Sequence, residues 1–493
     1  MFTSISVVTS LPKATLVIGV YAEQEKLPRS LSRLEKSSRL ELELVLKTPG
    51  FKADLGEAIP AGDGRLLIGM GKEKELSRDK LLLLGGKLVR ALDRMDIHEA
   101  ELTLAKIVPK KIASNEDAAQ LIAEGMGLAN WRVDFFDGEA TKTPKVKGRL
   151  KIKPRDASLK KALTRGLMLA ECTNYARKLA ATPPNICNPT WMASEAKKMA
   201  RACGLTCRVI NYAEAEKQGL GGIVNVGRGS KSKPCLIILE HKPVRPVKGV
   251  KLALVGKTIT YDTGGYSLKI SNGMKGMKYD KNGGMAVIGA MRAIAQLKLK
   301  TPVVALLPCA ENMVSDDAYR PDDIITMYNG VTVEVTNTDA EGRLVLGDAL
   351  AYACKKFKPT AIIDVATLTG GVVVALGSFC SGLWCDDAKL RKRIEKASVL
   401  TCEKIWRLPL WEDHRDFMRS KHADIWNSAP VRGAHPIQGA AFLSFFVDEN
   451  LPWAHLDIAG VSSVDSDKDM YVTGPTGYGV RLLTEVAQGY EKM

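Results

Sequence analysis

Apolar residues in the first 145 positions follow two spacings. Four apolar runs rich in Leu or β-branched residues predict strands: Ala14–Tyr21, Leu40–Lys47, Arg65–Gly69 and Ala100–Ile107. Apolar residues three or four apart predict helices over Ser77–Met95 and Ser114–Trp131, each opened by a serine suited to capping. We therefore expect a smaller N-terminal α/β domain over residues 1–145, and we find no catalytic cluster in it.

Strands and helices alternate along the rest of the chain. The predicted strands are Cys207–Asn211, Cys235–Leu239, Lys251–Val255, Pro302–Leu307 and Ala361–Val365, and the predicted helices are Ala157–Leu179, Pro189–Ala200, Gly284–Leu297 and Leu346–Lys355. This alternation favours a mixed, largely parallel sheet flanked by helices. Residues 146–180 are expected to be a basic linker and connecting helix, because Thr141–Arg155 is rich in Lys, Arg and Pro. Residues 181–493 are then a larger C-terminal domain.

Composition agrees with a globular α/β protein of two domains. The 493 residues are 45% hydrophobic and 26% charged. No apolar run reaches the roughly 18 residues that a membrane span needs, and Met1–Ser10 lacks the pattern of a secretory signal. Ten scattered cysteines without a C-x-x-C pair indicate a reduced, cytoplasmic protein.

The net charge of +16 leaves a second class of function open. It arises from 71 basic and 55 acidic residues and is compatible with nucleic-acid binding. The basic residues are spread widely, however, and the densest patch is Lys142–Lys161. A solvated surface is therefore the favoured interpretation, and a nucleic-acid-binding or regulatory role is the alternative.

The stretch Asn337–Leu344 holds Asp339, Glu341 and Arg343 at alternate positions. In an extended backbone all three side chains would project to one side. Adjacent carboxylates repel each other unless protons or cations compensate them, so a divalent cation would make the arrangement useful. The alternative is a polar loop in which Asp339 or Glu341 begins a helix.

Earlier in the chain, an apolar strand ending at Val255 leads into a second group of charged residues. Lys257, Asp262, Lys269 and Asp280 follow it in order, with a glycine pair after Asp262. In parallel sheets, ligands gather at the carboxyl ends of strands. Any one of these residues alone would be better explained as a turn or surface residue.

Taken together, the pattern resembles the leucine (cytosol) aminopeptidase family of dimetal exopeptidases. Three further blocks match the family: Tyr319-Arg320-Pro321, Asp364–Gly370 and Trp453–Gly460. The resemblance is strong from about residue 170 to 490 and loose before that.

The resemblance implies a metal-dependent aminopeptidase that releases N-terminal residues, Leu and other apolar ones, from peptides. It implies a role for each of eleven residues: metal ligands Lys257, Asp262, Asp280, Asp339 and Glu341; catalytic residues Lys269 and Arg343; and substrate-pocket residues Met277, Thr367, Gly370 and Ala459. Two divalent ions can share a water and lower its pKa. Carboxylate ligands leave Mn, Zn and Mg open as the metal. The resemblance also implies bicarbonate at Arg343 and a homohexamer.

The chain departs from the family at a few positions. Thr258 and Tyr261 replace the usual glycine and phenylalanine, and Lys281-Asn282 begin a stretch where the family has Met-x-Gly-Ala-Ala. Lys281 would weaken metal binding if it points inward and have no effect if it points outward. A weakly active or inactive homologue is therefore a further alternative. His455, in an apolar block, is expected to be structural.

Overall fold

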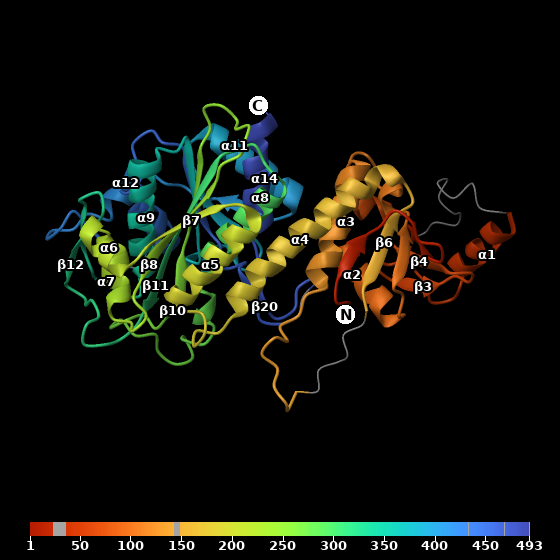
Figure 1. Ribbon diagram of the computed structural model, residues 1–493, viewed down its shortest axis with the longest axis horizontal. Helices are drawn as coiled ribbons and strands as arrows, with labels where there is room; N and C mark the ends of the chain where they lie inside the picture. Colours follow the sequence, from red (N-terminus) through yellow and green to blue (C-terminus); the bar gives the residue numbers. More distant parts are fainter. Residues whose placement is uncertain (23–35, 142–147, 432, 468, 493) are drawn as a thin grey trace. The chain divides into compact units, whose positions relative to one another are not determined.

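A computed structural model describes residues 1–22, 36–141, 148–431, 433–467 and 469–492 (Figure 1). The chain forms two compact units. The N-terminal unit comprises residues 1–174 and 465–473, and the C-terminal unit comprises residues 175–464 and 474–493.

The N-terminal unit contains a six-stranded sheet in the order β1-β6-β5-β2-β4-β3, in which only the β3–β4 pair is antiparallel. Its strands are β1 (Ile5–Val7), β2 (Thr15–Val20), β3 (Ala58–Pro60), β4 (Arg65–Gly69), β5 (Glu99–Leu102) and β6 (Leu150–Pro154). Its helices are α1 (Lys36–Leu46), α2 (Arg78–Arg94) and α3 (Asn115–Ala129), and α4 (Lys160–Ala181) runs into the C-terminal unit. The predicted caps are confirmed, because Ser77 accepts the Lys80 N–H and Ser114 accepts the Asp117 N–H.

Three predictions for this unit are wrong. Leu40–Leu46 lies in helix α1, where Leu42 is buried in the core and Leu44 is 69% exposed, and Lys47 follows in a turn. Ala100–Ile107 is a strand only to Leu102, and Leu104–Ile107 is a 3-10 helix. Leu150–Pro154, expected in the basic linker, is strand β6, whose Lys151 and Lys153 pair with Glu99 and Glu101 of β5. The rest of that stretch, residues 142–147, lies outside the described residues.

The C-terminal unit is built on a mixed, largely parallel sheet, as predicted, and the sheet has nine strands. The path runs β16-β15-β18-β14-β9-β11-β8-β7, and β10 pairs with β11. The central strands β10, β11, β9, β14 and β18 are mutually parallel, so their carboxyl ends share one edge. The strands of this sheet are β7 (Thr206–Ile210), β8 (Cys235–His241), β9 (Leu252–Gly256), β10 (Thr258–Asp262), β11 (Val303–Asn312), β14 (Ala361–Ala366), β15 (Ser381–Trp384), β16 (Ile405–Arg407) and β18 (Trp453–Asp457). Two small sheets add β12 (Ile324–Thr326), β13 (Thr332–Glu334), β17 (Ile425–Trp426), β19 (Ser463–Val464) and β20 (Gly474–Pro475).

Helices cover both faces of this sheet (Figure 1). One face carries α5 (Pro189–Cys203), α8 (Asn282–Gln296), α11 (Ala388–Thr401) and α14 (Val480–Gly489), and the other carries α6 (Tyr212–Gln218), α7 (Gly221–Arg228), α9 (Glu341–Phe357) and α13 (His435–Ser444). The shorter helices are α10 (Gly370–Leu376) and α12 (Glu412–Asp416). Within the described ranges, no helix combines the length and apolar content needed to cross a bilayer.

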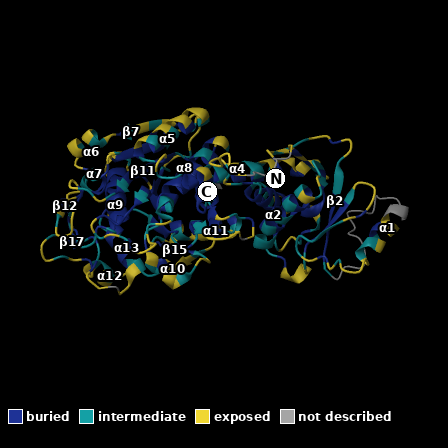
Figure 2. Ribbon diagram, turned by 90° about the horizontal axis from the view of Figure 1, so that it is seen from below, coloured by how far each residue is buried: buried dark blue, intermediate teal, exposed yellow. Residues whose placement is uncertain are grey.

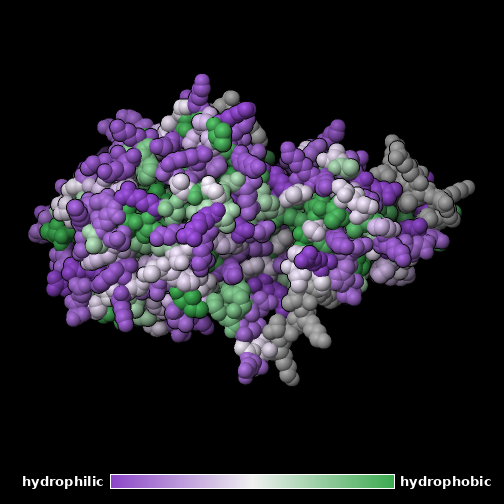
Figure 3. Space-filling model, in the orientation of Figure 1, coloured by the Kyte–Doolittle hydropathy of each residue, from purple (hydrophilic) through white to green (hydrophobic). Residues whose placement is uncertain are grey.

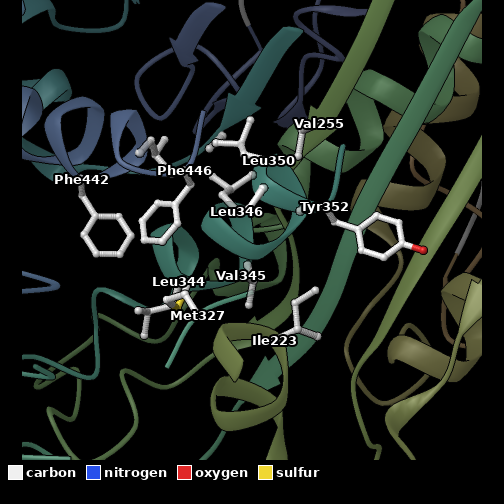
Figure 4. Close-up of a cluster of buried hydrophobic side chains, with 14 of the residues drawn as sticks. Ile223, Val255, Met327, Leu344, Val345, Leu346, Leu350, Tyr352, Phe442 and Phe446 are labelled. Atoms are coloured by element: carbon white, nitrogen blue, oxygen red, sulfur yellow. The ribbon is translucent and has the colours of Figure 1, made fainter. Parts of the chain in front are cut away.

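Helix α9 is buried from Glu341 to Cys354, which an ordinary surface helix would not be (Figure 2). Its apolar side chains form the centre of the main core together with residues of α7, β9 and α13 (Figure 4). The labelled members are Ile223, Val255, Met327, Leu344, Val345, Leu346, Leu350, Tyr352, Phe442 and Phe446. This packing fixes the first turn of α9, and with it Glu341, against the edge where the parallel strands end.

Candidate metal centre

The charged residues singled out in the sequence lie at this carboxyl edge. Lys257 follows β9, Asp262 ends β10, and Asp280 lies between the 3-10 turn Met277–Tyr279 and α8. Glu341 is the first residue of α9. Carboxylate oxygens of Asp262, Asp280 and Glu341 all lie within 4.8 Å of one another, and all three residues are buried.

Two ammonium groups lie among these carboxylates. Lys257 Nζ is 2.8 Å from Asp280 Oδ1 and 2.9 Å from Glu341 Oε1. Lys269 Nζ is 2.9 Å from Asp262 Oδ2 and 2.5 Å from Asp339 Oδ1. The structure thus brings together six of the seven residues expected to hold metal or catalyse.

The stretch Asn337–Leu344 is not extended. The expectation that Asp339, Glu341 and Arg343 project to one side is therefore wrong. Asp339 lies in a turn, where its N–H donates to Asn337 Oδ1 at 2.9 Å. The helical alternative is confirmed, because Glu341 begins α9. A carboxylate in a first helical turn is stabilised by the helix dipole. The turn and the helix start together bring both acids to the edge of the sheet.

Two buried asparagines hold the acidic residues in place, and neither was expected from the sequence. Asn312, at the end of β11, donates through Nδ2 to Asp262 Oδ1 at 2.9 Å and to the Thr338 carbonyl at 3.0 Å. Asn427 accepts the Thr336 and Asn337 N–H groups and donates to the Asn337 carbonyl. A polar residue ending an apolar strand was a usable signal for Asn312, whereas nothing near Asn427 in the sequence marks it.

Electrostatics of the cluster fit a divalent cation. Four carboxylates face two ammonium groups, so two negative charges remain unbalanced. Burial, followed by the neighbouring acids, raises the pKa of Asp280 and of Glu341 above their usual values. Among the described residues, nothing donates a hydrogen bond to the buried Asp280 Oδ2. Oxygen-rich sets of this kind suit hard divalent ions.

Both lysines are cationic in this arrangement. Burial alone would lower the pKa of Lys257, but Asp280 and Glu341 outweigh it and raise that pKa. Burial also acts to lower the pKa of Lys269, but Asp262 and Glu341 outweigh it and raise that pKa. Lys257 could ligate a metal only as the free amine, and a nearby dication would favour loss of its proton.

Arg343 lies apart from these ion pairs. Its Nη1 donates to the Asn427 carbonyl at 2.8 Å, and its buried Nε has no acceptor among the described residues. Burial lowers the pKa of Arg343 to about 10, so the guanidinium is still charged at neutral pH. A buried cation with an unused donor is suited to an anion.

Asp457, which ends β18, links the two loops that carry three of the four expected pocket residues. Its carboxylate accepts the N–H groups of Leu368, Thr369 and Ala459. This joins the loop of Thr367 and Gly370 to Ala459. Thr367 also donates through Oγ1 to Asp280 Oδ1 at 2.8 Å, and a Cβ added to Gly370 would meet open space. The fourth residue, Met277, opens the turn before Asp280, whose N–H donates to the Met277 carbonyl.

Three of the residues that depart from the family pattern are buried: Thr258, Lys281 and Asn282. Thr258 Oγ1 donates to the Gly256 carbonyl. A Cβ on Gly284 would lie 2.0 Å from Thr258 Oγ1. Lys281 points neither to the carboxylates nor to solvent, because it is fully buried and donates to two carbonyl groups. His455 is buried against Asp364, with 2.5 Å between Nδ1 and Oδ1.

Comparisons with known proteins agree with this geometry. Residues 174–484 match the model of the cytosol aminopeptidase family catalytic domain, and residues 17–137 match that of its N-terminal domain. The chain belongs to the cytosol aminopeptidase family. It is therefore a metal-dependent aminopeptidase by descent, a hydrolase of peptides.

Individual relatives cover nearly the whole chain. A probable cytosol aminopeptidase of Solibacter usitatus is 40% identical over 455 residues, which make up 92% of this chain and 90% of the relative. One of Aquifex aeolicus is 37% identical over 464 residues, 93% of this chain and 92% of the relative. Among solved structures, the bottromycin maturation enzyme BotP in complex with Mn is 31% identical, with a TM-score of 0.85 over 97% of this chain and 99% of that one.

Proposed function

We propose that this chain removes N-terminal residues from peptides at a centre of two divalent metal ions. The ions would be held by Lys257, Asp262, Asp280, Asp339 and Glu341. The observation that carries the proposal is the buried convergence of three carboxylates within 4.8 Å, with negative charge left unbalanced. When bound, the two ions would lower the pKa of a shared water and polarise the scissile carbonyl.

Lys269 would act on the substrate oxygen that becomes negative. Its side chain is 18% exposed, so it can reach a substrate, and its raised pKa keeps it charged. A cation already in position needs no reorganisation when that oxygen gains charge. Lys269 would therefore stabilise the oxyanion.

Arg343 would hold a small anion, which the family resemblance identifies as bicarbonate. The support is its buried guanidinium, whose Nε has no acceptor among the described residues. The anion would accept the proton of the attacking water, because no histidine lies in residues 257–280 or 337–344 to do so.

The residue removed would be apolar, with leucine the expected example. Met277, Thr367, Gly370 and Ala459 would line its pocket, and three of them are small. A carboxylate-rich ligand set suits Mn²⁺ or Mg²⁺ and also accepts Zn²⁺. The Mn complex of the similar BotP structure favours Mn²⁺. We extend the proposal to a cytoplasmic homohexamer, as the resemblance implies.

The direct test is hydrolysis of a leucyl chromogenic amide by metal-stripped protein, re-supplied in turn with Mn²⁺, Mg²⁺, Zn²⁺ and Co²⁺. Mutation of a residue that hydrogen-bonds a metal ligand typically lowers metal affinity or activity about 10- to 100-fold. Loss of a ligand itself should have a larger effect, so Glu341→Gln should lower the metal-dependent rate at least about 100-fold. Glu412→Gln, an exposed glutamate in α12, is the matched control and should keep it. Full activity of stripped protein, or of Glu341→Gln, would refute the proposal. Folded protein that is inactive with every metal would favour an inactive homologue.

A further inference from the structure

The residue after Asp280 is a lysine in an unusual environment. Lys281 has no exposed surface. Its Nζ donates to the Thr182 carbonyl at 3.2 Å and to the Lys278 carbonyl at 2.5 Å. Among the described residues, no carboxylate lies within ion-pairing distance of it, whereas a buried ammonium is ordinarily paired with one.

These two hydrogen bonds join separate parts of the chain. Thr182 directly follows the last residue of α4, and Lys278 is the middle residue of the turn Met277–Tyr279. The ammonium of Lys281 therefore clamps that turn to the end of α4. Because the Asp280 N–H donates to the Met277 carbonyl, the clamp acts on Asp280 directly.

The next residue makes a second link from the same point. Asn282, 5% exposed, donates through Nδ2 to the Ser462 carbonyl at 3.1 Å. Ser462 lies three residues after Ala459, and its own N–H donates to the Ile458 carbonyl. Asn282 thus ties the start of α8 to the loop that carries Ala459.

The start of α8 is held on its inner side as well. A Cβ on Gly283 would lie 2.1 Å from the Val365 carbonyl oxygen, and the Gly284 N–H donates to the Lys257 carbonyl at 2.7 Å. The backbone there is fixed against β14 and β9. Lys281 additionally fixes the position of the turn Met277–Tyr279. Asn282 additionally fixes the position of the loop that carries Ala459.

We propose that Lys281 and Asn282 are positioning residues for the metal centre and the substrate pocket. Lys281 holds Asp280 at the distance from Asp262 and Glu341 that a shared cation requires. Asn282 holds Ala459 opposite the turn of Met277. Neither residue touches metal or substrate, and the inference rests on the proposed function.

The test compares Mn²⁺ binding by metal-stripped, full-length proteins, measured by calorimetry and by electron paramagnetic resonance of free Mn²⁺. Lys281→Met removes the ammonium, leaves two carbonyl groups without a donor and should weaken binding at one Mn²⁺ equivalent about 10- to 100-fold. Asn282→Leu should raise the KM for a leucyl amide several-fold, with kcat changed less. Lys275→Met, an exposed lysine of the same loop, is the control and should match the unaltered protein.

Thermal unfolding of the stripped proteins separates positioning from a purely structural role. A positioning role predicts weaker Mn²⁺ binding by Lys281→Met with the unfolding temperature of the stripped protein kept or raised, because an unpaired buried charge is gone. A lower unfolding temperature with unchanged Mn²⁺ affinity would overturn the proposal for Lys281, and an unchanged KM would overturn it for Asn282. Unaltered protein that binds Mn²⁺ without hydrolysing the amide would instead refute the proposed function, while the affinity comparison still decides the role of Lys281.

Discussion

Asp348 is a carboxyl group enclosed by the main core, seven residues along α9 from Glu341. It lies in α9 with no exposed surface. Its oxygens accept the N–H groups of Ile223 and Tyr328, both at 2.9 Å. Burial raises its pKa to about 7 although these hydrogen bonds act in the opposite direction.

This carboxyl group makes stability depend on pH. Because its pKa is raised on folding, the folded protein binds a proton that the unfolded chain releases near pH 4. The stabilisation is therefore complete below that pH and is lost as the pH rises through 7. We expect the stability of the unaltered protein relative to Asp348→Asn to fall by about 2–3 kcal/mol between pH 5 and pH 8. Urea unfolding of both proteins at the two pH values measures it, and a constant difference would contradict the assignment.

At the residue scale, the sequence was most informative where its motifs resemble a known family. The resemblance implied roles for six charged residues, which the structure joins by four ion pairs. Asn312 and Asn427 could not be found in the same way. Their amides act on Asp262 and on residues 336–337, which are 50 or more positions away, so their roles exist only once the sheet has formed.

Elements were predicted well where period and capping agreed. Helices α2 and α3 were located with their serine caps, and β9, β11 and β14 of the central parallel strands were found from apolar runs. Leu40–Lys47 was predicted as a strand because the run is rich in Leu, whereas the structure places Leu40–Leu46 in helix α1. Leu and Glu are good helix formers. The helix turns Leu42 into a buried core cluster, a contact that the sequence alone does not show.

Close packing of α2 on α3 supplies a prediction at this scale. A Cβ on Gly125 of α3 would lie 1.8 Å from the Leu82 carbonyl oxygen of α2, and one on Gly85 would lie 2.0 Å from the Ile122 carbonyl oxygen. Gly125→Ala must push the helices apart. Alanine gains about 1 kcal/mol of helix propensity over glycine, but we expect a net loss of about 1–3 kcal/mol from overpacking.

Chemical unfolding followed by circular dichroism would measure this loss. Gly138→Ala, in the same unit and with open space around the added Cβ, is the control and should be nearly neutral. If Gly125→Ala proved as stable as the unaltered protein, the helices would not be in contact through their glycines.

For the molecule as a whole, the basic charge carries less information than its size suggests. Lys153 and Arg155 pair with Glu101, and Lys151 pairs with Glu99, so part of the densest basic stretch is neutralised within one sheet. On the face seen in Figure 3, hydrophilic side chains dominate and apolar ones form small groups. Net charge fixed neither the fold nor the site, because both depend on which groups are brought together.

Every candidate metal ligand lies in the C-terminal unit, between Lys257 and Glu341. A ligand that binds only the folded form stabilises what it binds, by about 2.7 kcal/mol at a concentration of 100 times Kd. Since the two units have separate cores, Mn²⁺ should protect the C-terminal unit selectively. Hydrogen exchange should slow in β10, in the first turn of α8 and in the first turn of α9, and should stay unchanged in α2 and α3.

Exchange measured by mass spectrometry, with and without Mn²⁺, resolves these segments. Glu341→Gln provides the matched control, because it keeps the shape of the side chain and removes one charged ligand. Its C-terminal unit should gain little protection from the same Mn²⁺ concentration. Equal slowing in both units, or unchanged slowing in Glu341→Gln, would mean that Mn²⁺ binds elsewhere and that the convergence of Asp262, Asp280 and Glu341 serves another purpose.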